Sequence, residues 1–412
     1  MARRTAKGST SPHLSRRGGL SAVSGLRAAG VACGLKKTGA LDLALVAADQ
    51  PATVAAVFTR NLVQAAPVQL SKRHLRGGRF SAIVLNSGNA NACTGVQGLR
   101  DAEQSAGEVA RLLERPIGEV FVASTGVIGR RLDMAALRKG IRAAAPRLSP
   151  KGGGAAARAI MTTDTVAKEA AVGVRIGRRE IAVGGMAKGS GMIAPNMATM
   201  LSVIATDAAI PSRVLQTALR GAVAETFNCI TVDGDTSTND MVLLFATGAT
   251  AVEIGPGTAG FRRFQAALTS VCQTLAKMIA RDGEGATKLA EIRVTGARSA
   301  REARQAAETV ANSPLVKTTL FGEDINWGRI MMALGRSGAR FDPTRVDLFV
   351  DGLPVVRRGE TRGDKAEAAA NRRLKAREFT LTADLHAGQG EVRIWTADLS
   401  EAYVRINAGY RT

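Results

Sequence analysis

The sequence has few of the residues that bind metals, form disulfide frameworks or stack on nucleic-acid bases. Its 412 residues include three histidines, four cysteines and 4% aromatic side chains. No apolar run is long enough to span a membrane. The cysteines are far apart and form no CxxC pair, which excludes the common zinc spacings and gives no disulfide framework; they are Cys33, Cys93, Cys229 and Cys272. We therefore expect reduced, buried thiols, no metal and no membrane partner.

Acidic residues are absent from the start of the chain. The first is Asp42, and residues 1–26 are rich in Arg and Ser but have no apolar core of signal-peptide length. We predict that residues 1–26 form a basic, disordered leader and that the protein is cytoplasmic. The alternative is a transit peptide, which would direct the protein to an organellar matrix.

The whole chain is basic, with 56 Lys and Arg against 35 Asp and Glu. Its net charge of +21 makes a nucleic-acid-binding protein a rival interpretation, because phosphate backbones attract such surfaces. However, the basic residues are scattered rather than gathered in one tract, and aromatic residues are few. We favour a surface that attracts anionic metabolites and expect no nucleic-acid partner. The length suggests roughly two to three globular domains.

The most informative stretch covers residues 184–208, GGMAKGSGMIAPNMATMLSVIATDA. Residues 188–191 predict a loop, because glycine tolerates backbone angles that other residues avoid. Pro195-Asn196 predicts a turn, and the apolar residues 200–206 predict a buried strand. The hydroxyl of Thr199 would then lie at the mouth of a strand. An ordinary threonine at a strand edge is the alternative.

This stretch resembles the self-cleavage site of the ornithine acetyltransferase family, also called glutamate N-acetyltransferase. The resemblance implies a cut between Ala198 and Thr199, which gives an alpha chain of residues 27–198 and a beta chain of residues 199–412. It also implies a layered α/β (α+β) fold of the helix-sheet-sheet-helix type, in which the two chains are entwined and assemble as a heterotetramer of two alpha and two beta chains. The residues that carry it are Lys188, Gly189, Gly191, Met192, Pro195, Met197, Ala198, Thr199, Met200 and Leu201.

The chemistry of threonine agrees with this resemblance. A threonine hydroxyl is a poor nucleophile until a base takes its proton, and a chain-terminal threonine carries that base as its own α-amine. With an ordinary pKa near 7.8, about one-seventh of such an amine is neutral at pH 7. Before the cut, the same hydroxyl can attack the carbonyl of Ala198 and form an ester that water opens. The mechanism needs no cofactor.

Further site residues follow from the resemblance. Thr125-Gly126 comes after a predicted strand and offers a hydroxyl and backbone N–H groups, although a plain β-turn is the alternative; the family uses this pair as the oxyanion hole. Glu284 lies between two glycines and suits the ammonium of ornithine, although a solvated turn is the alternative. The family's substrate-binding residues correspond here to Thr162, Lys188, Thr199, Glu284, Asn407 and Thr412.

The implied reaction transfers an acetyl group from N-acetylornithine to glutamate, with an acetylated Thr199 as intermediate. Some family members also accept acetyl-CoA as a co-substrate, and the sequence does not decide between one activity and two. A nearer alternative is an N-terminal-nucleophile amidase or aminopeptidase of similar fold, in which water takes the place of glutamate.

One acidic run has no role in this scheme. Residues 233–240, DGDTSTND, follow a predicted strand at 229–232, and a strand ending in DxD is typical of aspartate-nucleophile phosphotransferases. Ser237 stands where that class usually has Thr or Val, and Thr238 stands where a calcium loop needs glycine. An Asx-rich turn is the remaining interpretation, and we assign no metal to the run.

The spacing of apolar residues, together with the Gly, Pro and capping residues that end helices and strands, predicts the remaining elements. Helices are expected at residues 96–113, 134–145, 155–161, 212–227, 260–280 and 364–375. An Asn/Gly loop is expected at 86–95, and the final residues are expected to fray unless they fold into the active site as in the family. Strands are expected at 41–58 (broken at 49–51), 81–85, 119–123, 170–176, 179–183, 289–294, 345–350, 377–385 and 391–396.

Overall fold

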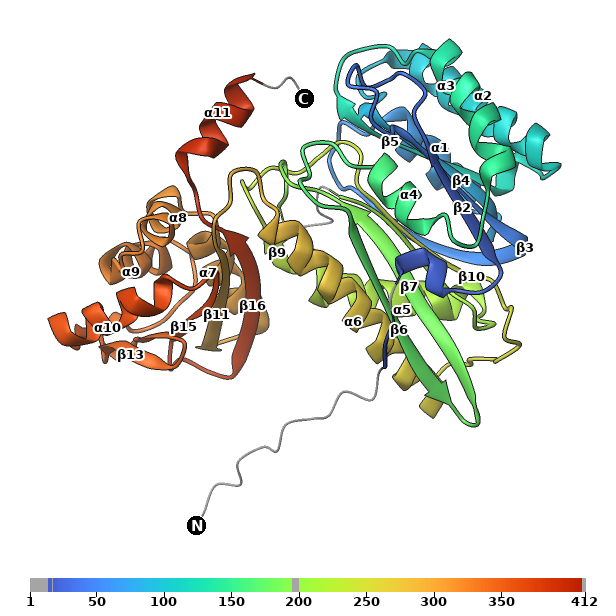
Figure 1. Cartoon of the computed structure of the whole chain (residues 1–412). Coiled ribbons are helices and arrows are strands. Elements are labelled where there is room, and N and C mark those ends of the chain that lie inside the picture. Colours follow the sequence, from blue (N-terminus) through green and yellow to red (C-terminus); the bar gives the residue numbers. More distant parts are fainter. Residues whose placement is uncertain (1–13, 17, 195–199, 410–412) are drawn as a thin grey trace.

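The computed structural model describes residues 14–16, 18–194 and 200–409 (Figure 1). These residues form a larger and a smaller lobe, each built on one mixed sheet. In the described residues the sheet of the larger lobe has nine strands, in the spatial order β1 (Leu14–Arg16), β6 (Lys168–Ile176), β7 (Arg179–Lys188), β8 (Leu201–Thr206), β10 (Met241–Ala246), β3 (Leu43–Phe58), β4 (Arg79–Asn89) and β5 (Val120–Val127), and β2 (Leu26–Val31) also pairs with β3.

The long strand β3 belongs to both halves of this sheet. Its residues 43–48 pair with β2 and β4, whereas residues 53–58 pair with β10. Successive side chains of a strand point to opposite faces, so Leu45 packs in the outer core of one half and Val46 in the core between the halves. That inner core also takes in residues of β4, β5, β7 and β8. The two halves thus pack face to face.

Helices cover the outer faces of both halves. On the side of β4 and β5 these are α1 (Ala66–Leu75), α2 (Gly95–Leu113) and α3 (Met134–Ala144); on the side of β6 to β8 they are α5 (Ser212–Glu225) and α6 (Ala259–Arg281). The short α4 (Gly153–Ala159) contributes to the inner core. The expected helix-sheet-sheet-helix layering is confirmed (Figure 1).

The smaller lobe is a second sheet covered by helices. The helices that share its apolar core are α7 (Ala300–Ala311), α8 (Pro314–Phe321), α9 (Trp327–Gly335) and α10 (Asp364–Leu374). A last helix, α11 (Glu401–Gly409), leads away from this lobe toward the larger one (Figure 1). The strands, in spatial order, are β14 (Glu360–Thr361), β13 (Leu353–Arg357), β12 (Asp347–Val350), β15 (Glu378–Asp384), β11 (Leu289–Ala297), β16 (Gly390–Ala397) and β9 (Ile230–Thr231).

The prediction that the disordered leader extends to residue 26 is wrong. A 3₁₀ helix at Gly19–Ala22 packs on the larger sheet, and Leu20 is fully buried. The approach to β7 is so close that a Cβ at Gly184 would lie 2.2 Å from the carbonyl oxygen of Gly19. Apolar residues at Leu20, Val23 and Leu26 explain why this segment folds. Residues 1–13 lie outside the described residues.

Three smaller expectations are also wrong. The strand at 41–58 is not broken at 49–51, since β3 continues through a register shift. The Asn/Gly loop begins only after β4 ends at Asn89, because the buried Asn86 is held by hydrogen bonds to Asn89 and Ser124. Cys93 is exposed rather than buried.

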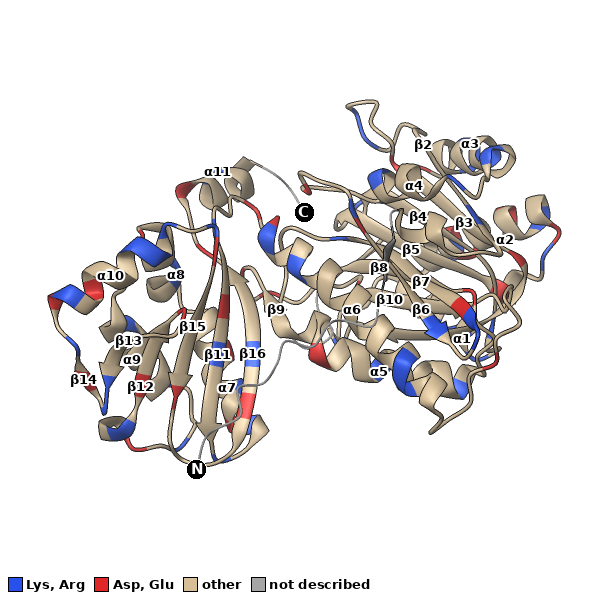
Figure 2. Cartoon of the chain, turned by 60° about the horizontal axis from the view of Figure 1, so that its bottom comes forward, with Lys and Arg blue, Asp and Glu red and all other residues tan. Residues whose placement is uncertain are grey.

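The remaining features of the described residues are their surface charges, the length of their helices and their potential metal ligands. Lys and Arg are scattered over both lobes and interleaved with Asp and Glu (Figure 2). Among the described residues no helix combines the length and the apolar character needed to cross a bilayer. The same residues contain no group of three His, Cys, Asp or Glu side chains arranged to hold a metal ion.

Candidate active site

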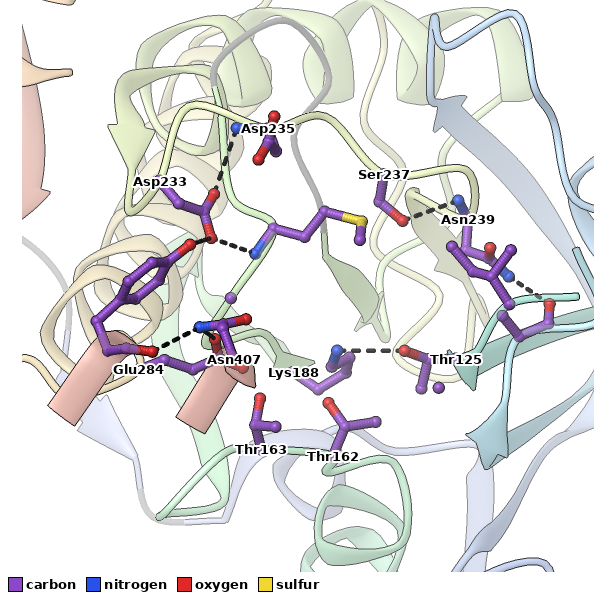
Figure 3. Close-up of a pocket in the computed structure, with 16 residues that line it drawn as sticks. Thr125, Thr162, Thr163, Lys188, Asp233, Asp235, Ser237, Asn239, Glu284 and Asn407 are labelled. Carbon is purple, nitrogen blue, oxygen red and sulfur yellow. Dashed lines mark hydrogen bonds between the residues drawn. The ribbon is translucent and has the colours of Figure 1, made fainter. Parts of the chain in front are cut away.

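A cavity of about 190 Å³ opens between the ends of β5 and β7, the acidic run and α11 (Figure 3). Six of the predicted site residues line it, although they are spread over nearly 300 positions of the sequence; they are Thr125, Gly126, Thr162, Lys188, Glu284 and Asn407. The predicted nucleophile Thr199, its neighbour Ala198 and Thr412 lie outside the described residues.

The first wall of the cavity is the end of β5. Gly126 has a φ of +127°, and a Cβ there would lie 2.4 Å from the carbonyl carbon of Gly88 on β4, so only glycine fits. The hydroxyl of Thr125 accepts a hydrogen bond from Lys188 Nζ at 3.2 Å. Its own proton is therefore free to point at a ligand in the cavity.

Lys188 is the last residue of β7, which runs further than the strand expected at 179–183. The residue is 6% exposed, and burial lowers the pKa of its ammonium group, although the opposite charge of Asp164 raises it. Burial would raise the pKa of Asp164, but Lys188 and Lys168 outweigh it and lower that pKa to about 2. An ionised Asp164 therefore lies beside two buried lysines.

Asp164 also organises the backbone around Lys188. One oxygen accepts hydrogen bonds from Lys168 Nζ and from the N–H of Gly189, both at 2.7 Å. The other oxygen accepts the N–H of Thr162 at 2.9 Å. The segment around Thr162 is thereby fixed at the cavity.

The opposite wall carries a carboxylate. Glu284 is 7% exposed, and its Oε2 accepts a hydrogen bond from Asn407 Nδ2 at 2.9 Å. A Cβ at Gly191 would lie 2.3 Å from the same oxygen, which explains glycine at that position. Asn407 comes from α11, so the chain as far as residue 409 folds over the site (Figure 3).

Several residues without a predicted site role also line the cavity, among them Asp233, Asn239 and Tyr403. Asp233 accepts the backbone N–H groups of Met192 and Ile193 at 2.6 and 2.8 Å, and burial raises the pKa of its carboxyl. Tyr403 lies beside Asp233 at 3.4 Å, and burial together with the Asp233 charge raises the pKa of its phenol. The acidic run was the only sequence signal for Asp233 and Asn239.

Comparison with known proteins decides the family. The model of the ArgJ family matches residues 27–412. The chain belongs to the ArgJ family. It is therefore an acetyltransferase of arginine biosynthesis, and the resemblance seen in the sequence is confirmed.

Individual relatives of the same name match nearly the whole chain. The Arginine biosynthesis bifunctional protein ArgJ of Symbiobacterium thermophilum is 54% identical and covers 96% of this chain and 99% of that protein. The protein of the same name from Geobacter sulfurreducens is 48% identical, with 95% and 100% covered. A crystal structure of the Bacillus halodurans ArgJ protein has 45% identity and a TM-score of 0.50, and the match covers 52% of this chain and 100% of that one.

Proposed function

We propose that this chain cuts itself between Ala198 and Thr199 and then transfers acetyl from N-acetylornithine to glutamate through an acetylated Thr199. One observation carries the proposal. A hydroxyl and an ammonium, on Thr125 and Lys188, face a buried carboxylate, on Glu284, across one cavity large enough for an amino acid (Figure 3). Those are the groups needed to hold an acyl oxygen, a substrate carboxylate and a substrate ammonium.

In the first step, Thr199 Oγ attacks the carbonyl carbon of Ala198. The bond to the Thr199 nitrogen breaks, the hydroxyl proton passes to that nitrogen, and water then hydrolyses the ester. The match to a solved chain supports this cut, because that whole chain aligns with 52% of this one, and residues 199–412 make up the same share of the sequence.

In the mature enzyme, the α-amine of Thr199 takes the hydroxyl proton, and Oγ attacks the acetyl carbonyl of N-acetylornithine. The oxyanion is stabilised by the Thr125 hydroxyl and the Gly126 N–H, and removing one such donor typically costs about 3 kcal/mol of barrier. Ornithine leaves with the proton. The α-amine of glutamate then attacks the acetyl ester, which releases N-acetylglutamate and restores Thr199.

Substrate recognition follows from the charges on the two walls. Lys188 pairs with a substrate carboxylate, since a flexible ammonium suits that charge. Glu284, oriented by Asn407, accepts the ammonium of ornithine, and Thr162 completes the described part of the site. Thr412 contacts substrate only by family resemblance.

The remaining expectations belong to the same proposal. The alpha and beta chains stay together as a heterotetramer of two each, without a metal or nucleotide cofactor, and the enzyme works in the cytoplasm. Acetyl-CoA as a second acetyl donor would make the enzyme bifunctional, as the names of its relatives state of those proteins.

The test begins with the intact mass of the purified chain under denaturing conditions, beside a Thr199→Ala variant. We expect two fragments that meet at Ala198 and Thr199 in wild type, and one whole chain in the variant. Acetyl transfer to glutamate is then assayed with N-acetylornithine and, separately, with acetyl-CoA.

Each alternative function gives a different result in these assays. Release of free acetate without transfer would indicate an amidase. A wild-type chain that stays whole would contradict the mechanism. Strongly salt-dependent binding to nucleic acid, with no cut, would favour the rival class.

A further inference from the structure

The acidic run at residues 233–240 has no role in the proposed reaction, yet it is hydrogen-bonded to described residues on both sides of the proposed cut. Its first and last carboxylates bind backbone N–H groups on the two sides of residues 194–199, which contain the Ala198-Thr199 bond. Asn239, the residue before the last, binds the strand that leads to Thr125.

Asp233 holds the side before the cut. Its two carboxylate oxygens accept the N–H groups of Met192 and Ile193, one each, at 2.6 and 2.8 Å. The residues before Asp233 reinforce this contact, since the N–H of Val232 donates to the Ile193 carbonyl at 2.8 Å and the hydroxyl of Thr231 does so at 3.1 Å. Both the N–H and the C=O of Ile193 are therefore fixed by one segment.

Asp240 holds the side after the cut. Asp240 is 3% exposed, and one oxygen of its carboxyl accepts the N–H of Met200 at 2.9 Å. The next residue, Met241, donates its N–H to the Met200 carbonyl at 3.0 Å. Met200 follows Thr199 directly, so these hydrogen bonds hold the residue next to the nucleophile.

Asn239 joins the run to the oxyanion site. Its amide donates to the carbonyl of Ser124 at 2.8 Å and to that of Ala90 at 2.7 Å, and its oxygen accepts from Thr238. Ser124 immediately precedes Thr125 on β5. The same eight residues therefore fix both flanks of the scissile segment and the strand that carries the oxyanion donors.

We propose that residues 233–240 form a clamp that positions the scissile segment of the precursor against Thr125 and Gly126, so that Asp233 and Asp240 are positioning residues for self-cleavage. This inference rests on the proposed cut at Ala198-Thr199. The clamp residues exchange no bonds or protons in that step. They act through alignment, because a misplacement of about 1 Å in reacting groups can slow a reaction about a hundredfold.

The test measures the rate of self-cleavage by intact mass in full-length Asp233→Ala and Asp240→Ala chains. We expect uncut precursor to accumulate in each and cleavage to be about a hundredfold slower in the double variant. Asp240→Asn keeps an amide oxygen for the Met200 N–H and should restore cleavage. Asp233→Asn keeps one acceptor of two and should cleave at an intermediate rate.

Asp398→Ala is the matched control. Asp398 is 4% exposed and also accepts two backbone N–H groups, those of Thr287 at 2.8 Å and Lys288 at 3.0 Å, but it touches neither flank of the cut. Its loss should lower stability and leave the cleavage rate unchanged. Amide hydrogen exchange in a Thr199→Ala background should become faster at Met192 and Ile193 when Asp233 is replaced, and at Met200 when Asp240 is replaced.

The outcomes separate the clamp from the proposed function. If wild type is cut and the two alanine variants are cut at the same rate, the clamp is wrong and the proposed function stands. Equal slowing in Asp398→Ala would also overturn the clamp, because the effect would then be one of stability. If wild type itself stays whole, the proposed function fails and the clamp with it.

Discussion

The side-chain size and the charge that a position in the cavity permits are set by the neighbouring residues. Gly191 is small because the Glu284 carboxylate occupies the space where a side chain would be. Asp164 is ionised because two buried lysines lie beside it. Each constraint predicts the effect of one substitution.

Gly191→Ala should weaken substrate binding without preventing folding. The added methyl group would lie 2.3 Å from Glu284 Oε2, so the carboxylate must move. We expect the KM for N-acetylornithine to rise about tenfold, equivalent to roughly 1.4 kcal/mol, with a smaller change in kcat. Steady-state kinetics measure this.

Gly107→Ala on α2 is the control for that substitution. Its Cβ would meet Ile117 at an ordinary 3.6 Å, and alanine in a helix should add about 0.5–1 kcal/mol of stability. An unchanged KM in Gly191→Ala would mean that Glu284 does not bind the substrate.

Asp164 should make stability depend on pH in acid. The folded-state pKa of about 2 is below the ordinary 3.8, so the ionised form stabilises the fold above pH 4, and this contribution is lost as the pH falls from about 4 to about 2. The shift corresponds to about 2 kcal/mol. Urea midpoints measured between pH 5 and pH 2 should fall less steeply in Asp164→Asn than in wild type, and equal slopes would contradict the assignment.

Among the elements, α11 contributes to the site and little to the fold. Its nine described residues, Glu401–Gly409, include none that is buried, yet Asn407 reaches Glu284 and Tyr403 reaches Asp233. Burial of apolar surface is the main source of folding energy, so such a helix adds little stability. Its role is to close one side of the cavity.

A chain that ends after Ser400 should therefore fold and cut itself but bind substrate poorly. Self-cleavage continues because Asp233 still holds Met192 and Ile193. The KM for N-acetylornithine should rise at least about tenfold, since a hydrogen bond to a charged group contributes about 1.5–3 kcal/mol. Val404→Ser is the control, because Val404 is on the same helix and 63% exposed. A large fall in the thermal midpoint of the shortened chain would contradict this account.

At the scale of the whole molecule, the proposed cut divides the sequence but not the fold. Strands β8 and β10 follow residue 199, and in the larger sheet they lie between β7 and β3, which precede it. In addition, Lys168 of the first part donates to Asp282 of the second at 2.5 Å, and the Lys168 side chain is fully buried. The two fragments can separate only if the sheet and this ion pair are broken.

The two fragments should therefore elute together under native conditions and separate only in denaturant. Lys168→Met leaves Asp164 and Asp282 without their common cation, and breaking a buried pair costs about 3–5 kcal/mol. We expect the urea midpoint for unfolding to fall accordingly, and Lys168→Met combined with Asp282→Asn to recover part of the loss. Fragments that separate without denaturant would contradict the shared sheet.

The order of elements was largely predictable from the sequence. Apolar periodicity located α2, α3 and α6 to within one or two residues. Strand ends were less predictable. Strands β7 and β4 run beyond their expected ends because they stay paired with neighbouring strands. The end of the leader was predicted wrongly. The basic composition of residues 1–26 indicated disorder, whereas Leu20, Val23 and Leu26 are apolar and buried.

The sequence by itself located most helices and strands, because these depend on local periodicity. Through the family resemblance, which a motif of adjacent residues carries, it also indicated the family, the layered fold and six residues that share a cavity. Only the tertiary structure decided the roles suggested for Asp233, Asn239 and Tyr403, and the buried arrangement of Asp164 with Lys168 and Asp282. These side chains meet across sequence separations of up to 170 residues. Such contacts arise when distant strands pair and helices pack, and no local pattern in the chain encodes them.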